Sequence, residues 1–397
     1  MEFSNNLVSF FIPSWLLILA GFVLSIAITW KAIPPIVDVA HLTGLNKNPN
    51  HRSSHENGTP LFGGVAVFAG FTVSTIIIAG TGFVYELKYI IAGLIILFFV
   101  GIKDDIFIID PKKKLIAQIA ASLIVIVLGD IRIENFHGVG GIFGISYFAS
   151  VLFTLFVFIV IINGFNLIDG IDGLASGVGI ITSVTFGIWF WISGHIPYVI
   201  LCFSLAGSLI AFFRFNVFSI KNKIFLGDTG SLIIGLAISV IVTRFLQYEV
   251  NATGLAIIPS APTVAIGILI IPLFDTLRVF ILRIANGRSP FKADRIHVHH
   301  CLIDLVNSHI KATFIMLVTN ILFIVLVLIL RNIGDGALIT IVLALATGLS
   351  YIPVYLLRMK KDAIKKGDIN VDNASEVSEK GRLLRFIRFF QGFLNML

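Results

Sequence analysis

The sequence has little charge. Only 13% of its 397 residues are Asp, Glu, Lys or Arg, whereas 57% are hydrophobic. Soluble domains carry about a quarter charged residues, so this deficit excludes a soluble enzyme and indicates an integral membrane protein. The mean hydropathy of +0.99 agrees. Only two cysteines are present, Cys202 and Cys301, which excludes a disulfide framework and a cysteine-based zinc site.

The alternating ten-residue segments of outer-membrane barrels are also absent, and the apolar runs are long and continuous. The sequence therefore predicts an all-α integral membrane protein with about eleven transmembrane helices. The expected ranges are 7–30, 61–80, 87–103, 115–129, 147–163, 174–193, 197–213, 229–247, 262–283, 312–330 and 336–357. The N-terminus lacks a basic segment and a cleavage site, so we expect the first span to be retained.

Lysine and arginine are unequally divided between alternate ends of these spans. The richer side holds Lys31, Lys47, Arg52, Lys103, Lys112, Lys113, Lys114, Arg214, Lys221, Lys223, Arg283, Arg288, Lys292, Arg295 and Lys311. The poorer side holds Lys88, Arg132, Arg244 and Arg331. Basic loops stay in the cytoplasm, so we expect the N-terminus outside and the C-terminus in the cytosol. These loops also account for the net charge of +7 without a nucleic-acid partner.

A polar stretch between two apolar runs is the most informative part of the sequence. Asn163, Asn166, Asp169 and Asp172 recur every three residues there and, in a helix, share one face. Unpaired carboxylates at this depth are costly, so the pattern predicts a cation or a polar partner. Capping of helix ends by these residues is the alternative.

Further carboxylates lie at the ends of predicted spans on the same side of the membrane. Asp104 and Asp105 are adjacent at the mouth of a predicted span, and Asp228 opens another between Gly227 and Gly230. Adjacent carboxylates repel unless a divalent cation or a lysine lies between them, and such pairs hold Mg²⁺ beside phosphates. Helix capping is the alternative for Asp228. Lys114 is expected to meet an anionic substrate, and its alternative role is to set the orientation of the chain in the membrane.

Two basic loops are candidates for binding anions. Arg52 and His55 either contact phosphate or lie near lipid headgroups. His297, His299 and His300, close to Arg295, indicate an anion-binding cradle. Ligation of a transition metal is the less favoured alternative, because no cysteine or spaced glutamate completes such a site.

Two features stand apart from these loops. Asp275 and Arg278 are expected to pair inside the ninth span. Residues 1–357 form the predicted transmembrane catalytic domain, in which Pro60 precedes two glycines expected to approach a neighbouring helix closely. Residues 358–397 are expected to form a basic cytosolic tail with an interfacial amphipathic helix near its end.

Together these motifs resemble the polyprenyl-phosphate N-acetylhexosamine-1-phosphate transferases. The resemblance covers Pro49 to His300, and the motifs that carry it are Pro49…Arg52…His55…Pro60…Gly63-Gly64, Asp104-Asp105, Asn163…Asn166…Asp169-Gly…Asp172-Gly, Asn216…Gly227-Asp228 and Asp294-Arg295…His297-Val-His299-His300. The last motif is similar to the undecaprenyl-phosphate GlcNAc-1-phosphate branch. The muramoyl-pentapeptide branch instead carries a run of histidines followed by aromatic and acidic residues.

The resemblance implies an activity and a location. A UDP-N-acetylhexosamine, typically UDP-GlcNAc, gives its sugar 1-phosphate to undecaprenyl phosphate and releases UMP, which begins lipid-linked synthesis of a cell-envelope glycan. Mg²⁺ or Mn²⁺ is the implied cofactor. The implied place is the bacterial plasma membrane, with the active site facing the cytosol. A homodimer is left open.

The resemblance also suggests roles for individual residues. Asp228 is expected to bind the metal, helped by Asp104, Asp105 and Asp172. The residues expected to position the uridine or sugar are Asp169, Asn163 and Asn166. The expected diphosphate-binding residues are Arg295, His297, His299 and His300, and those for the lipid phosphate are Arg52 and Lys114. His55 and Asn216 complete the expected substrate contacts, and Asp104, Asp105, Asp169 and Asp228 are the catalytic candidates.

Two mechanisms are compatible with these residues. The lipid phosphate either attacks the β-phosphorus of the donor directly, which we favour, or attacks a phospho-sugar first bound covalently to an aspartate and releases that aspartate. A secondary transporter is the non-enzyme alternative, and it predicts mid-membrane polar groups and inverted repeats. A CDP-alcohol phosphotransferase would require an arginine that the segment after Asp172 lacks.

Overall fold

The computed structural model describes residues 13–45, 58–79, 84–285, 287 and 297–365. Within these ranges the regular elements are helices, and the β pairing consists of one isolated bridge between Asn135 and Gly144. The prediction of an all-α protein is therefore confirmed for the part of the chain that is described.

The helices of the first half are α1 (Ser14–Thr43), α2 (Gly63–Ile78), α3 (Val84–Ile106), α4 (Pro111–Leu123) with the π-helical turn η2 (Ile124–Leu128), the short η3 (Val139–Gly141), α5 (Tyr147–Ile168) and α6 (Leu174–Ile192). Those of the second half are α7 (Ile196–Phe218), α8 (Gly227–Glu249), the short η4 (Gly254–Ala256), α9 (Ala261–Ile268), α10 (Ile270–Ala285), α11 (Val298–Val306), α12 (His309–Ile329) and α13 (Asp335–Lys365).

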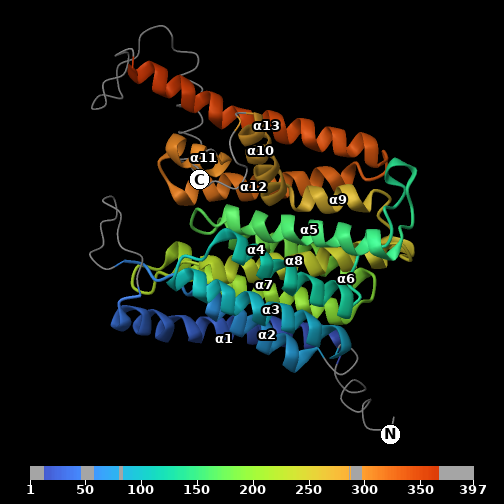
Figure 1. Ribbon diagram of the computed structural model, residues 1–397, viewed down its shortest axis with the longest axis horizontal. Helices are drawn as coiled ribbons and strands as arrows, with labels where there is room; N and C mark the ends of the chain where they lie inside the picture. The colour runs from blue at the N-terminus through green and yellow to red at the C-terminus, as the bar shows by residue number, and fades with distance from the viewer. Residues whose placement is uncertain (1–12, 46–57, 80–83, 286, 288–296, 366–397) are drawn as a thin grey trace.

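Most of these helices run side by side in a bundle (Figure 1). Among the described residues, eight helices are long and apolar enough to cross a membrane, and nine if the bent pair α9 and α10 counts as one span. The shorter α2 and the pair α4 and η2 occupy the two remaining predicted ranges. The structure therefore has the character of a multi-pass membrane protein.

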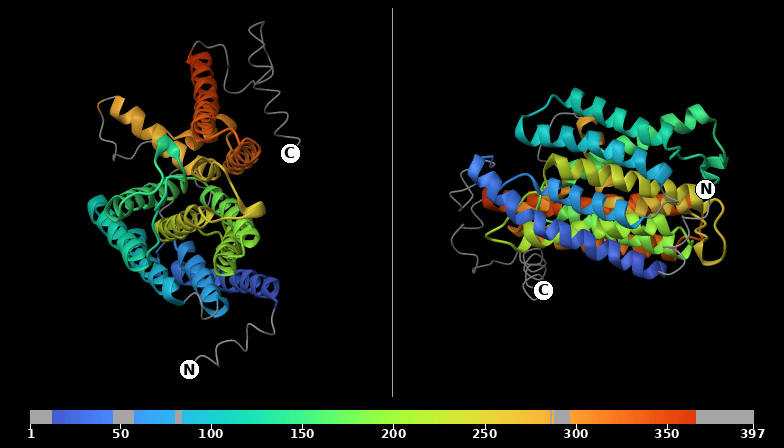
Figure 2. Two further views of the ribbon diagram at one scale, coloured as in Figure 1. Left: turned by 90° about the vertical axis from the view of Figure 1, so that its right-hand side faces the viewer. Right: turned by 90° about the horizontal axis from the view of Figure 1, so that it is seen from below.

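The ninth predicted range, 262–283, is divided into two helices. The axes of α9 and α10 differ by 83°, so α10 leaves the direction of the bundle (Figures 1 and 2). A break of this kind frees backbone carbonyls that a continuous helix would pair. The buried amide of Asn320, on α12, donates to the carbonyl of Ile268 at 3.2 Å. The polar contact thus stabilises the bend.

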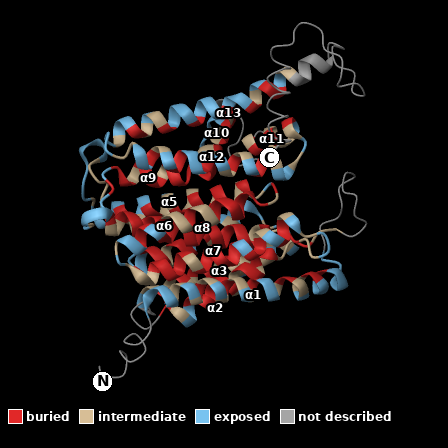
Figure 3. Ribbon diagram, turned by 180° about the vertical axis from the view of Figure 1, so that it is seen from behind, coloured by how far each residue is buried: buried red, intermediate tan, exposed pale blue. Residues whose placement is uncertain are grey.

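Helix α8 is the centre of the bundle (Figure 3). Its apolar 18-residue stretch is completely buried by protein, and every other candidate span among the described residues is less buried. Gly235 brings α8 close to α5, because a Cβ atom at this position would lie 2.6 Å from the Cα of Ile162. Small residues at such contacts allow backbones to approach and to gain dispersion energy.

The first turn of α8 is held against the start of α2. The amides of Gly63 and Gly64 donate to the carbonyls of Phe225 and Leu226, both at 2.9 Å. A Cβ atom on Gly64 would lie 2.1 Å from the backbone nitrogen of Gly230. The expected close approach of the paired glycines is confirmed, and it fixes the backbone immediately around Asp228.

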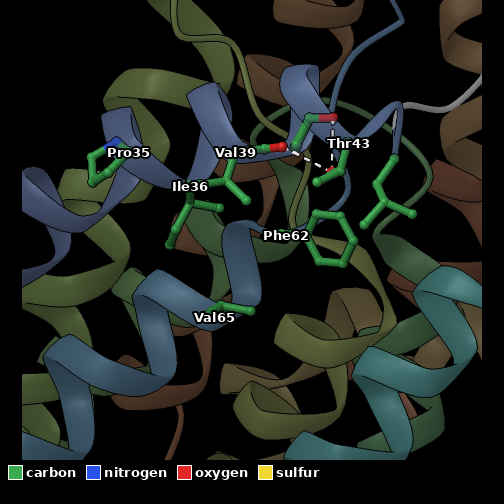
Figure 4. Close-up of a pocket in the computed structure, with 8 residues that line it drawn as sticks. Pro35, Ile36, Val39, Thr43, Phe62 and Val65 are labelled. Atoms are coloured by element: carbon green, nitrogen blue, oxygen red, sulfur yellow. Dashed lines mark hydrogen bonds between the residues drawn. The ribbon is translucent and has the colours of Figure 1, made fainter.

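Two apolar pockets lie beside the bundle. The first, of about 340 Å³, lies between the last turns of α1 and the start of α2 and includes Val39, Phe62 and Val65 (Figure 4). The hydroxyl of Thr43 in this pocket donates to the carbonyl of Val39 at 2.8 Å, so the lining offers little polar chemistry. The second, of about 280 Å³, lies among α10, α11, α12 and α13.

Helix α13 continues to Lys365 and so passes through the domain boundary expected at 357. The amphipathic helix predicted near the end of the tail lies outside the described residues.

Candidate active site

Two carboxylates meet one partly buried ammonium group at the end of the bundle where α3, α4 and α8 come together. The Nζ atom of Lys114 lies 3.0 Å from Oδ2 of Asp104 and 2.5 Å from Oδ1 of Asp228. The two carboxyl groups are also close enough to interact with each other. Two negative charges side by side repel, so they require a cation between them.

Local structure places the side chains of Asp104 and Lys114. Asp104 lies in the last turn of α3, and its Oδ1 accepts the amide of Ile109 at 2.8 Å, which fixes the turn into α4. Asp110 caps α4 by accepting the amide of Lys112 at 2.8 Å, and Pro111 occupies the first helical position. Lys114 follows one turn later and points back to Asp104.

Lys114 precedes the apolar run of α4, and its charge depends on these two neighbours. Burial opposes the protonated form, but the negative charges and hydrogen bonds of Asp228 and Asp104 outweigh it and raise the pKa of the Lys114 ammonium above its ordinary value. The side chain is therefore a permanent cation at neutral pH.

Asn166 joins this group from α5. Its amide donates to Oδ1 of Asp228 and, at 2.9 Å, to the hydroxyl of Ser231. The side chain of Asp228 keeps 33% of its surface exposed, whereas that of Asp104 keeps 10%. Asp228 is therefore the carboxylate of the pair that a solute reaches more readily.

Asp105 performs a different task from its neighbour. Its Oδ1 accepts the amide of Asp228 at 2.7 Å, and its Oδ2 accepts the amide and hydroxyl of Thr229 at 3.1 and 2.6 Å. The first amides of a helix lack partners within that helix, and an external carboxylate here satisfies two of them. Capping of α8 thus comes from Asp105 and not from Asp228.

Gly227 makes this arrangement possible. Its φ of +75° lies in the left-handed region, and a Cβ atom would lie 2.7 Å from Oδ2 of Asp105 and 2.2 Å from the carbonyl oxygen of Leu61. Only glycine avoids both the strain and the collision.

Asn163 pairs with a residue that the motifs did not indicate. Its Nδ2 donates to Oε1 of the buried Gln118 at 2.8 Å and to the carbonyl of Ile159 at 2.8 Å. Gln118 lies four residues after Lys114, so one face of α4 meets both α5 and α8. That spacing was the signal in the sequence that could have identified Gln118.

Helix α5 ends at Ile168, so only the two asparagines of the polar stretch lie on a helical face. Asp169 caps the helix, and Asp172 lies in the turn that follows. Oδ2 of Asp172 lies 2.7 Å from Nζ of Lys223. Asp172 is thus held by a lysine other than the one shared by Asp104 and Asp228.

Asn216 fixes the same turn. Its Oδ1 accepts the amide of Gly173 at 2.7 Å, and its Nδ2 donates to the carbonyl of Ile224 at 2.9 Å. The hydroxyl of Thr313, on α12, donates to the carbonyl of Asp172 at 2.7 Å. Neither Lys223 nor Thr313 belongs to a recognisable sequence motif.

The histidines lie at the start of α11, beside this turn. Nδ1 of His297 and Nδ1 of His299 each lie 3.1 Å from Oδ2 of Asp275, on α10. Nε2 of His299 is buried without a hydrogen-bond partner, and a Cβ atom on Gly170 would lie 2.8 Å from it. The ring of His300 is centred 4.3 Å from that of His299. Asp275 thus contacts two histidines. The expected pairing of Asp275 with Arg278 stays a prediction.

Three expected site residues, Arg52, His55 and Arg295, lie outside the described residues. The remaining ones divide into two groups. Asp104, Asp105, Lys114, Asn166 and Asp228 form one connected group, and beside it Asn163 contacts Gln118. The other group comprises the turn with Asp169 and Asp172, Asn216, which fixes that turn, and His297, His299 and His300.

Comparison with known proteins agrees with the motifs. The sequence matches Glycosyl transferase family 4 over residues 87–246. It is 31% identical over 272 residues to the undecaprenyl-phosphate α-N-acetylglucosaminyl 1-phosphate transferase of Escherichia coli K12, covering 67% of this chain and 71% of the relative. It is 30% identical over 311 residues to the decaprenyl-phosphate N-acetylglucosaminephosphotransferase of Mycobacterium tuberculosis H37Rv, covering 73% of this chain and 76% of the relative. The chain belongs to the family of polyprenyl-phosphate N-acetylglucosamine-1-phosphate transferases.

Proposed function

We propose that this protein transfers N-acetylhexosamine 1-phosphate, with GlcNAc as the sugar, from a UDP-sugar to undecaprenyl phosphate and releases UMP. The proposed reaction begins the lipid-linked synthesis of a cell-envelope glycan. The observation that carries the proposal is the convergence of Asp104, Lys114, Asn166 and Asp228 from four helices in a chain of this family.

The chemistry requires positive charge where two anions meet. Two unit charges about 4 Å apart repel by about 4 kcal/mol at an effective dielectric constant near 20. Lys114 supplies one cation among the carboxylates, and in this proposal it also faces the phosphate of the lipid. An oxygen of that phosphate attacks the β-phosphorus of the UDP-sugar, and the bond to the bridging oxygen breaks so that UMP leaves.

The carboxylates fit a divalent cation. Asp104 and Asp228 crowd around one ammonium group and supply the oxygen ligands that Mg²⁺ prefers, and Asp228 is accessible. In this proposal these two residues hold the ion, and Asp105, engaged by α8, keeps Asp228 in place. The bound ion would supply electrostatic stabilisation of charge on the phosphate oxygens.

The second group of residues would bind the donor. In this proposal Asp169, Asn163 and Asn166 position the uridine or sugar, and the loop of Arg295, His297, His299 and His300 binds the diphosphate. Asp172, Asn216, Arg52 and His55 complete the substrate contacts. Their common side of the membrane is proposed to be the cytosol, in agreement with the distribution of lysine and arginine.

Transfer can be tested with purified protein and defined substrates. UMP release from UDP-GlcNAc is measured with and without undecaprenyl phosphate, with UDP-GalNAc and 6-deoxy relatives compared under the same conditions. We expect release to depend on both lipid and Mg²⁺ and to be fastest with UDP-GlcNAc. Release that is independent of the lipid would contradict the proposal. A phospho-sugar trapped on Asp104 or Asp105 without lipid would replace the direct mechanism by the two-step one.

A further inference from the structure

Asp275 is a buried carboxylate to which neither the motifs nor the proposed reaction gives a role. It lies on α10, the helix that departs from the bundle by 83°, and it is 3% exposed. One side of it borders the 280 Å³ cavity, whose other lining residues include Ile270, Phe274 and Leu302. An ionised carboxylate in such surroundings is costly unless hydrogen-bond donors surround it.

The donors come from the start of α11. Oδ2 of Asp275 lies 3.1 Å from Nδ1 of His297 and 3.1 Å from Nδ1 of His299, and Oδ1 accepts the amide of Val298 at 3.0 Å. A carboxylate only accepts hydrogen bonds, so each Nδ1 atom must carry a proton. The contact therefore specifies which nitrogen of each ring is protonated.

The same contact directs the opposite nitrogen of His299. Its Nε2 is buried without a partner and lies next to Gly170, in the turn between Asp169 and Asp172. Within the described residues, Asp275, His297 and His299 are also close enough together to hold a metal ion. Both Nδ1 atoms lie 3.1 Å from the same carboxylate oxygen, which is a hydrogen-bond distance. Mg²⁺ prefers oxygen ligands to imidazole. The three side chains therefore fit a hydrogen-bonded group better than a Mg²⁺ site.

We infer that Asp275 is a positioning residue, which holds His297 and His299 with Nδ1 toward α10 so that Nε2 of His299 faces the turn where the donor diphosphate binds. The inference rests on the proposed function for the identity of that ligand, but the orientation of the rings stands on the contacts alone. The bend between α9 and α10 is what brings the carboxylate behind the histidines.

The orientation can be measured without any activity. In protein labelled with ¹⁵N-histidine, the ring nitrogens of His297 and His299 are assigned by comparison with His297→Gln and His299→Gln. We expect protonated Nδ1 in both rings at neutral pH. Oδ1 of Asp275 accepts the fixed amide of Val298, so in Asp275→Asn the amide oxygen should take that place and the NH₂ group should face both Nδ1 atoms. At least one ring should then move its proton to Nε2. Unchanged spectra in Asp275→Asn would overturn the inference.

Kinetics separate positioning from a merely structural role. Asp275→Asn should lower kcat/KM for the UDP-sugar by about 10- to 100-fold, as loss of groups that orient ligands usually does, with the KM for the lipid acceptor unchanged. Asp275→Glu, which keeps a carboxylate, should restore part of the loss. The matched control is Asp304→Asn, on an exposed residue of α11, which should leave the rates unchanged. A lower content of folded protein with unaltered constants would contradict positioning.

A mutant cycle identifies the route of the effect. In a His297→Gln/His299→Gln background, Asp275→Asn should cause no further loss, because its partners are gone. Multiplicative losses would show that Asp275 acts elsewhere. A transition metal that co-purifies with the wild type and is lost in Asp275→Asn would also overturn the inference. If wild-type protein shows no transfer at all, the proposed function fails, whereas the ring spectra still test Asp275.

Discussion

Lys114 and Asp228 lie 114 positions apart in the sequence, and yet the ammonium of one is 2.5 Å from the carboxylate of the other. The pair connects α4 to the central helix α8, and Asp104 adds a second carboxylate to the same ammonium at 3.0 Å. Removing the lysine would leave two partly buried negative charges without a protein cation. Loss of one partner from such a charged group costs more free energy than the intact group contributes.

Lys114→Met should therefore reduce transfer strongly. Loss of one charged group that faces the reacting phosphates costs about 10²- to 10³-fold in kcat, and we expect a loss in that range from UMP-release assays. Lys113→Met, at an exposed neighbouring position of the same helix, is the control and should remain active. Equal effects of the two substitutions would argue for a general contribution of positive charge at the membrane surface.

Asp228→Asn should abolish transfer and leave the protein folded and inserted. The amide still accepts hydrogen bonds from Asn166 and Lys114, but it removes the accessible negative charge that would hold the metal. Activity and the Mg²⁺ dependence of thermal stability are measured together, with EDTA-treated wild type as the reference. Near-normal turnover in this variant would refute a metal role for Asp228.

Thr229→Val tests the contact between Asp105 and α8. The substitution keeps the shape of the side chain but removes the hydroxyl that donates to Asp105 at 2.6 Å. Leaving a buried acceptor short of a donor costs about 1–3 kcal/mol, so we expect a lower Tm and reduced transfer. Thr229→Ser keeps the hydroxyl and should be closer to wild type. A valine variant with the Tm and activity of the wild type would show that the amides of Asp228 and Thr229 alone hold Asp105.

Gly64→Ala should be among the most damaging single methyl additions. The new Cβ atom would lie 2.1 Å from the backbone of Gly230, which has no side chain that can move aside. Overpacking typically costs about 1–3 kcal/mol, and a rigid backbone places this site at the upper end. Gly348→Ala, in α13 with no atom within 4 Å of the added Cβ, is the control. Comparable melting curves for both variants would contradict the close packing.

The proposed orientation predicts opposite accessibility for the two ends of the bundle. In a background with Cys202→Ala and Cys301→Ala, Lys113→Cys should react with a membrane-impermeant maleimide only from the cytosolic side. Leu255→Cys, beyond the far end of α8 and 87% exposed in the structure, should react only from outside. The reverse pattern would invert the proposed topology.

Some features of this molecule follow from sequence alone because they are local. The apolar lengths predict the helices, and the spacing of Gly63 and Gly64 after Pro60 predicts a close helix contact. Asp104, Lys114, Asn166 and Asp228 could be grouped because each occurs at the same side of a predicted span. The structure brings these four together.

Other features depend on the backbone path and were not predictable. Asp105 and Asp104 are neighbours with the same chemistry, but only the geometry directs one to the amides of α8 and the other to Lys114. Asp275 contacts the histidines because α10 turns by 83°, and hydropathy carries no record of that angle. Lys223 is a single polar residue whose partner, Asp172, comes from a distant segment.

The complete enclosure of α8 by protein has a consequence for the membrane in which the protein works. Hydrophobic mismatch acts on helices that touch lipid, and it is relieved by tilting or by local thinning of the bilayer. Because α8 is shielded, we expect the least buried candidate spans, α1 and α13, to take up such adjustments. We then expect the depth of Asp228 to be set by its neighbours in the bundle and to stay the same in thin and thick bilayers.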